Sequence, residues 1–154
     1  MENTMSYIDR LIANCQAAKK ASPEREFVME DISGLEGIDQ AIYVIEQIDG
    51  DSEKTFIEFS QYKKTKERSC SKLNSPSQVM YVGSSTTGLK NRISQHIGDG
   101  PIGTYSLHLK HWYRGKYKVS IKVYSEPIEV LQIIEDDLSD KLQPAFGKKG
   151  GNNK

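Results

Sequence analysis

One carboxylate, Glu135, interrupts the apolar stripe of a helix expected near the C-terminus of the chain. Leu131, Leu138 and Leu142 lie four residues before, three after and seven after it, so the four side chains share one helical face. A buried carboxylate without a partner is costly, which predicts a cation, an arginine or a metal ion beside it. Glu135 is therefore a candidate metal ligand or catalytic carboxylate. The alternative is a glutamate at the stripe edge that reaches solvent or forms an ordinary ion pair.

Arg92 and His96 are the next candidates. Their i, i+4 spacing on an expected helix places them on one face, immediately beside Leu89 and Ile93. Polar residues on the flank of a core-facing stripe can line a cleft between a helix and a sheet. They can equally form a routine surface pair.

Two tyrosines, Tyr43 and Tyr81, each lie within an apolar run that is typical of a strand. A tyrosine in such a run commonly packs in the core with its hydroxyl at the edge. Alone, neither the tyrosines nor the Arg92 and His96 pair define a function.

The elements that must position these residues follow from apolar periodicity and turn signals. The helix at 55–66 is expected to begin with a capping box made by Thr55 and Glu58. The fold class is a small α+β domain, with a short mixed or antiparallel three-stranded sheet flanked by helices. The expected strands are residues 41–48, 79–84 and 116–124, and the expected helices are residues 7–20, 55–66, 87–97 and 127–142.

The length of 154 residues fits one domain with one core. Residues 1–38 are expected to form an N-terminal helical extension docked on the main domain, residues 39–154. No apolar run approaches the ~20 residues that span a bilayer, and the N-terminus lacks the pattern of a signal peptide. Cys15 and Cys70 lie far apart without a CxxC motif, which indicates free thiols in a reducing cytoplasm and argues against structural zinc.

The formal net charge of zero hides a segregation of charge. Residues 24–53 carry ten acidic side chains and one basic, whereas residues 61–124 carry twelve lysines or arginines and two acids. The basic part also interleaves aromatic rings with cations, as in residues 110–118. This mixture suits a nucleic acid, because cations contact phosphates and rings can stack on bases. The alternative is two solvated surfaces that differ in charge.

The segments Ala41-Ile42-Tyr43 and Tyr81-Val82-Gly83 add a motif to these features. They resemble the paired motif that names the GIY-YIG nuclease family. Arg92 of an Arg-xxx-His helix lies eleven residues after the second tyrosine, and the late helix with its glutamate is followed by Leu142-Gln143-Pro144. The order and residue types agree over about 41–153. The HLKHW and GKKGGNN segments also resemble a bacterial subgroup near the restriction enzymes.

Three features depart from the pattern of that family. Ala41 replaces the first glycine, and Val82 replaces an isoleucine. The 37 residues between the two tyrosines exceed the usual hairpin-length link, so an insertion is expected at about 46–78. Gly147 holds the place of the family's asparagine after the helix-ending proline, and the nearby candidates are Asn152 and Asn153.

The resemblance implies a metal-dependent DNA endonuclease. Glu135 would bind one Mg²⁺ or Mn²⁺, and Arg92 would hold the scissile phosphate. Tyr43 is the candidate general base, with Tyr81 beside it to position water or a phosphate oxygen. Because a phenolate at pH 7 costs about 4 kcal/mol, His96 could accept the phenolic proton or orient the ring. Which of Tyr43 and His96 is the base stays open at this point.

The expected partner is DNA, in restriction, defence or genome maintenance, and a homodimer would suit double-strand cutting. The rival hypothesis is a non-catalytic nucleic-acid-binding module of the same fold. The side chains expected to contact DNA are Lys63, Lys64, Lys110, Asn152 and Asn153, with Tyr105, Lys66 and Arg68 as further candidates.

Overall fold

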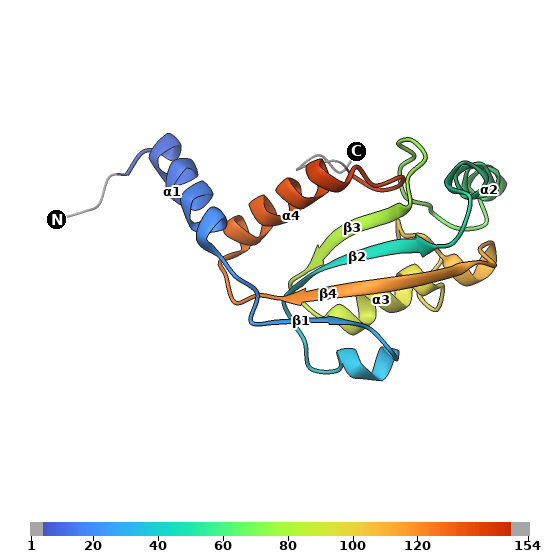
Figure 1. Ribbon diagram of the computed structural model, residues 1–154, viewed down its shortest axis with the longest axis horizontal. Coiled ribbons are helices and arrows are strands. Elements are labelled where there is room, and N and C mark those ends of the chain that lie inside the picture. Colours follow the sequence, from blue (N-terminus) through green and yellow to red (C-terminus); the bar gives the residue numbers. More distant parts are fainter. Residues whose placement is uncertain (1–4, 149–154) are drawn as a thin grey trace.

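The computed structural model describes residues 5–148 (Figure 1). The proposed DNA contacts Asn152 and Asn153 lie outside this range. The described chain forms one antiparallel sheet with helices on both faces and at both ends. In spatial order the strands are β1 (Arg25–Val28), β4 (Lys116–Val123), β2 (Ala41–Ile48) and β3 (Val79–Ser85). The helices are α1 (Tyr7–Lys20), α2 (Ser52–Thr65), α3 (Leu89–Ile97) and α4 (Ile128–Leu142), with 3-10 turns η1 (Ile32–Leu35) and η2 (Leu109–His111).

The α+β class is confirmed, but the expectation of three strands is wrong by one. The fourth strand, β1, adds to the free edge of β4 with Phe27 opposite Ile121. It is four residues long and mostly exposed, so its sequence lacks the alternating apolar pattern of a half-buried strand. Its pairing comes from backbone hydrogen bonds to β4, which a single sequence does not display.

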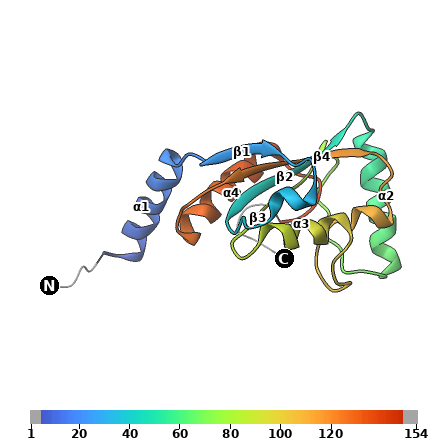
Figure 2. The same ribbon diagram turned by 90° about the horizontal axis from the view of Figure 1, so that it is seen from below.

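Two helices cover opposite faces of the sheet (Figures 1 and 2). On one face, Leu89 and Ile93 of α3 join the larger core cluster, which also contains Tyr43. On the other face, Leu131 of α4 packs in a smaller cluster with Ile42. Because side chains alternate along a strand, Ile42 and Tyr43 face opposite helices. The strand β3 lies at the sheet edge, where both helices can approach one site.

The segment expected as an insertion contains α2, which lies beyond the end of the sheet (Figure 1). The predicted capping box is wrong, because the helix begins earlier. The carboxylate of Asp51 caps it by accepting hydrogen bonds from the Glu53 and Lys54 amides. Phe59 anchors α2 to the core. Its ring centroid lies 4.4 Å from that of Phe146 and 4.9 Å from that of Trp112.

The N-terminal helix α1 has the predicted bounds and is capped by Ser6. It lies beside α4 and extends away from the sheet (Figures 1 and 2). None of its residues is buried, and its apolar side chains Ile8 and Ile12 are exposed. Cys15 and Cys70 are both free thiols, as predicted. Among residues 5–148, no helix has the length and apolar character needed to cross a bilayer.

Candidate active site

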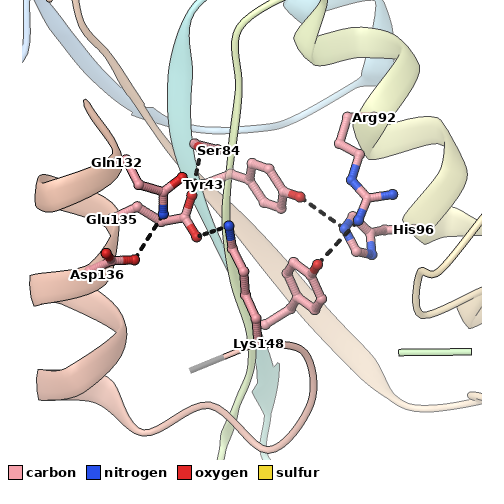
Figure 3. A network of polar contacts seen from close by, with 9 residues as sticks. Tyr43, Ser84, Arg92, His96, Gln132, Glu135, Asp136 and Lys148 are labelled. Atoms are coloured by element: carbon pink, nitrogen blue, oxygen red, sulfur yellow. Dashed lines mark hydrogen bonds and ion pairs between the residues drawn. The ribbon is translucent and has the colours of Figure 1, made fainter. Parts of the chain in front are cut away.

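The edge strand β3 lies between α3 and α4, and a cavity of about 660 Å³ opens there. Helix α3 contributes to it from one face of the sheet and α4 from the other (Figure 3). His96 lies behind this cavity, fully buried. The other four predicted site residues line the cavity: Tyr43, Tyr81, Arg92 and Glu135.

The two tyrosines are diagonal neighbours on adjacent antiparallel strands. Tyr43 of β2 is opposite Gly83 of β3, and Tyr81 is opposite Ile45, so both tyrosines lie on the same face. Their rings are stacked, with centroids 6.0 Å apart and an interplanar angle of 3°. The strand pairing therefore brings together two residues that are separated by 37 others along the sequence.

Glycine at position 83 is required by this close approach. A Cβ atom there would lie 2.5 Å from the Tyr43 hydroxyl oxygen and 2.9 Å from a ring carbon of Tyr81. Gly147 crowds the same ring from another side, since a Cβ atom at this position would lie 2.6 Å from Tyr81. Its φ of +93° is also one that a side-chain-bearing residue rarely adopts. The two glycines leave space for the tyrosine pair.

The hydrogen bonds of His96 determine its tautomer. The Leu107 amide donates to Nδ1 at 3.2 Å, so this nitrogen carries no proton. Burial lowers the pKa of His96 well below its usual range, and the charge of Arg92 acts in the same direction. The ring is therefore neutral, and its one proton is on Nε2. Nε2 lies 2.9 Å from the Tyr43 hydroxyl oxygen and donates to it.

Tyr43 is held in its protonated form in this arrangement. Burial raises the pKa of Tyr43 above its ordinary value, with the neighbouring Tyr81 as a second cause. The charge of Arg92 acts in the opposite direction, but burial dominates. The Tyr43 oxygen accepts the hydrogen bond from His96 (Figure 3), so its own proton points away from that ring.

Arg92 is fixed at the cavity wall by three acceptors. Its NH1 group donates to Oε1 of Gln95 at 2.8 Å. Its NH2 group donates to the Tyr81 hydroxyl at 3.1 Å and to the Tyr105 carbonyl at 3.0 Å. The guanidinium also lies over the Tyr81 ring, 5.9 Å from its centroid. The predicted cleft position of Arg92 is thus present, and its orientation is set by the second tyrosine.

Glu135 is 1% exposed, as the leucine stripe predicts. Ser84 donates a hydrogen bond to Oε1, and the Lys148 ammonium lies 3.4 Å from Oε2 (Figure 3). Burial raises the pKa of Glu135, and these two partners oppose that effect. Lys148 supplies the cation that a buried carboxylate requires. Neither partner was identified from the sequence, although Lys148 directly follows Gly147.

One carboxylate at the cavity, that of Glu135, offers the oxygen ligands that a hard divalent cation such as Mg²⁺ prefers. Glu135 offers carboxylate oxygens at the cavity, and its neighbouring ammonium shows that this position accepts positive charge. Within residues 5–148, no three His, Cys, Asp or Glu side chains are grouped as a metal site. Mg²⁺ can bind through one or two carboxylates because it keeps several waters and takes further ligands from substrate phosphates.

The predicted DNA contacts differ in their positions. Lys63 lines the cavity, and its ammonium donates to the Ser71 carbonyl at 3.1 Å. Lys64 is exposed on α2, next to that lysine in sequence. Lys110 does not line the cavity, and it forms an ion pair with Asp99. The structure thus brings Lys63 to the site and leaves Lys110 apart from it.

Comparison of the chain with family models, curated proteins and solved structures gives no match.

Proposed function

We propose that this protein is a divalent-metal-dependent endonuclease that hydrolyses phosphodiester bonds in DNA, related to the GIY-YIG nucleases. The observation that carries the proposal is the convergence of Tyr43, Tyr81, Arg92 and Glu135 on one cavity. These residues come from two strands and two helices on opposite sheet faces. A fold that needed only to pack its core would have no reason to bury a carboxylate beside a cationic, phenol-lined cavity.

Arg92 is the proposed phosphate clamp. Three of its N–H groups are engaged by Gln95, Tyr81 and Tyr105, so its remaining N–H donors are directed by a fixed guanidinium. A planar guanidinium with preset orientation suits a tetrahedral phosphate, whose charge it stabilises as the bond breaks. Tyr81 orients the guanidinium through its hydroxyl.

Tyr43 is the proposed general base, and His96 is its positioning residue. In the neutral tautomer described above, Nε2 of His96 is a donor and has no lone pair with which to take the Tyr43 proton. The same donor hydrogen bond stabilises negative charge on the Tyr43 oxygen. The charge of Arg92 also favours the phenolate, against the effect of burial. After the Tyr43 proton is lost to solvent, the phenolate would act by removing a proton from the attacking water.

Glu135 would hold the metal ion, with Ser84 fixing one carboxylate oxygen. When bound, a divalent ion supplies positive charge that stabilises the developing negative charge on the phosphate and the leaving oxygen. The cost of a buried carboxylate is then offset by the ion in place of a side-chain partner. A role in restriction, defence or genome maintenance is consistent with this chemistry.

A homodimer is part of the proposal for double-strand cutting, because one such site cuts one strand at a time. The prediction is that a monomeric protein nicks supercoiled plasmid, whereas a dimer also gives linear product. Analytical ultracentrifugation at the assay concentration relates the product to the oligomeric state.

The decisive experiment is incubation of supercoiled plasmid with the protein and Mg²⁺ or Mn²⁺, with EDTA as the metal-free control. Glu135→Ala should abolish nicking. Asp137→Ala is the matched control, because Asp137 is an exposed carboxylate on the same helix and pairs with Lys141. Equal nicking by Glu135→Ala and the wild type would indicate a contaminant or another site.

The rival hypothesis is a nucleic-acid-binding module without catalysis. The same protein sample distinguishes it from a nuclease. It predicts retardation of DNA in a native gel without metal-dependent cleavage of either DNA or RNA. That combination would overturn the proposed activity while leaving nucleic-acid binding in place.

A further inference from the structure

Lys148 is held at the cavity by an anchored backbone. The side-chain amide of Asn74 donates to the Pro144 carbonyl at 3.1 Å and to the Gly147 carbonyl at 2.9 Å. The Gly147 amide donates to the Lys72 carbonyl at 2.8 Å. The chain immediately before Lys148 is thereby fixed to the loop that follows α2. The ammonium group can move by side-chain rotation while its Cα atom stays near the cavity.

The Lys148 side chain reaches from this anchor to Glu135, on the far side of the cavity from Arg92 (Figure 3). The Lys148 side chain is 19% exposed and that of Glu135 is 2% exposed, so the pair is shielded from solvent. With Ser84 on Oε1 and Lys148 on Oε2, both carboxylate oxygens have a partner. Glu135 is therefore satisfied before any divalent ion binds.

A divalent ion and this ammonium cannot both occupy Oε2 at close range. Two like charges about 4 Å apart repel strongly at a partly buried site, because the effective dielectric there is well below that of water. A metal ion that binds Oε2 of Glu135 would therefore displace the lysine. The displaced ammonium remains tethered in a cavity whose proposed substrate is a phosphodiester, and an ammonium on a flexible stem is a common phosphate ligand.

We propose that Lys148 is an exchangeable internal cation: it neutralises Glu135 in the metal-free protein, leaves when the metal binds, and then contacts the phosphate of the DNA. This inference rests on the proposed function, because it assigns Glu135 to the metal and the cavity to DNA. It makes Lys148 a substrate-binding residue of the same site. It also makes the affinity for metal weaker than the carboxylate alone would give.

The test of displacement measures Mn²⁺ binding without DNA, by isothermal titration calorimetry at pH 8. Lys148→Met keeps the length of the stem and removes the competing charge. It should bind Mn²⁺ about tenfold more tightly than the wild type. Lys141→Met is the matched control, because Lys141 pairs with an exposed carboxylate on the surface of α4 and should leave the affinity unchanged. Thermal unfolding checks that both variants are folded.

The test of phosphate contact measures plasmid cleavage at saturating Mn²⁺. Lys148→Met should cleave at least about tenfold more slowly than the wild type despite its tighter metal binding. Equal or weaker Mn²⁺ binding by Lys148→Met would overturn the displacement. Tighter binding with wild-type cleavage would overturn the phosphate contact.

Failure of this inference and failure of the proposed function give different results. If neither the wild type nor the two lysine variants bind Mn²⁺, the displacement and the proposed metal-dependent function are both overturned. If Lys148→Met binds Mn²⁺ more tightly but no protein cleaves DNA or RNA, the displacement stands and the nuclease activity is overturned.

Discussion

The Tyr43 hydroxyl accepts, and does not donate, the 2.9 Å hydrogen bond that joins it to His96. The cause is a third group, the Leu107 amide, which donates to the other ring nitrogen and leaves the only imidazole proton on Nε2. His96 can therefore stabilise a Tyr43 phenolate but cannot create one by removing its proton. The open choice between the two residues as general base is thus resolved, within the proposed mechanism, in favour of Tyr43.

Removal of the Tyr43 hydroxyl should lower the cleavage rate by at least about 100-fold, the range expected for loss of a general base. Tyr43→Phe keeps the ring and its stacking on Tyr81, so the fold should persist. Because burial raises the pKa of Tyr43, the wild-type rate should increase with pH from 7 to 9, as the phenolate becomes more populated.

The measurement is the single-turnover rate of plasmid nicking across that pH range. Tyr124→Phe is the control, since Tyr124 is a buried tyrosine of the cluster on the opposite sheet face. An unchanged rate and pH profile in Tyr43→Phe would remove Tyr43 from the role of base.

Arg92→Lys should lose most of the activity, about 100-fold, because an ammonium cannot reproduce a bidentate contact with phosphate. It also cannot hold Gln95, Tyr81 and the Tyr105 carbonyl together. Initial rates at saturating metal measure the effect. Arg10→Lys on the remote helix α1 is the matched control, and its rate should equal that of the wild type. Near-normal cleavage by Arg92→Lys would contradict the phosphate-clamp role.

Gly83→Ala should damage the tyrosine pair. The added Cβ atom would meet the Tyr43 oxygen at 2.5 Å and the Tyr81 ring at 2.9 Å. We expect a loss of about 1–3 kcal/mol in the free energy of unfolding, as for other overpacked cores, together with reduced cleavage. Gly103→Ala provides the comparison, because a Cβ atom at Gly103 meets nothing within 4 Å. Urea unfolding of both variants measures the loss. Equal stability of Gly83→Ala and Gly103→Ala would show that a Cβ atom at position 83 does not strain the tyrosine pair.

The buried neutral His96 should make the protein less stable in mild acid. Its pKa is lower in the folded than in the unfolded protein, so the unfolded chain binds more protons. The contribution of His96 to stability is therefore complete above the unfolded pKa of about 6.5 and decreases as the pH falls below it, by up to about 1.4 kcal/mol per pH unit.

The measurement is urea unfolding at pH 7.5 and 5.5 for the wild type and for His96→Gln. The raised pKa of Glu135 has the opposite sign, because protonation of a buried carboxyl favours the folded state as pH falls, and it is shared by both proteins. The difference between them should therefore report His96. An identical pH dependence in both proteins would show that His96 is not the acid-sensitive group.

Most elements of the fold could be predicted from the sequence, because their patterns are local. The helix at 7–20 and the strand at 41–48 have the predicted bounds, since apolar periodicity and turn residues specify each of them within a few positions. Strand β1 could not be predicted, because four mostly exposed residues carry no such pattern. The start of α2 was misplaced because a Thr55 and Glu58 pair imitates a cap that Asp51 in fact provides.

The features of the candidate site likewise divide into those that the sequence predicts and those that only the tertiary structure decides. The sequence by itself determined that Glu135 shares a helical face with three leucines, because helical periodicity sets which face a residue occupies, and it predicted a cation beside that carboxylate if it is buried. Only the tertiary structure decided that this cation is Lys148 and that Ser84 holds the other oxygen. The tautomer of His96 likewise depends on the Leu107 amide, which only the folded chain brings to the ring. Each of these partners lies outside the helix of the residue that it contacts, and no local pattern encodes a contact that forms only when the chain folds.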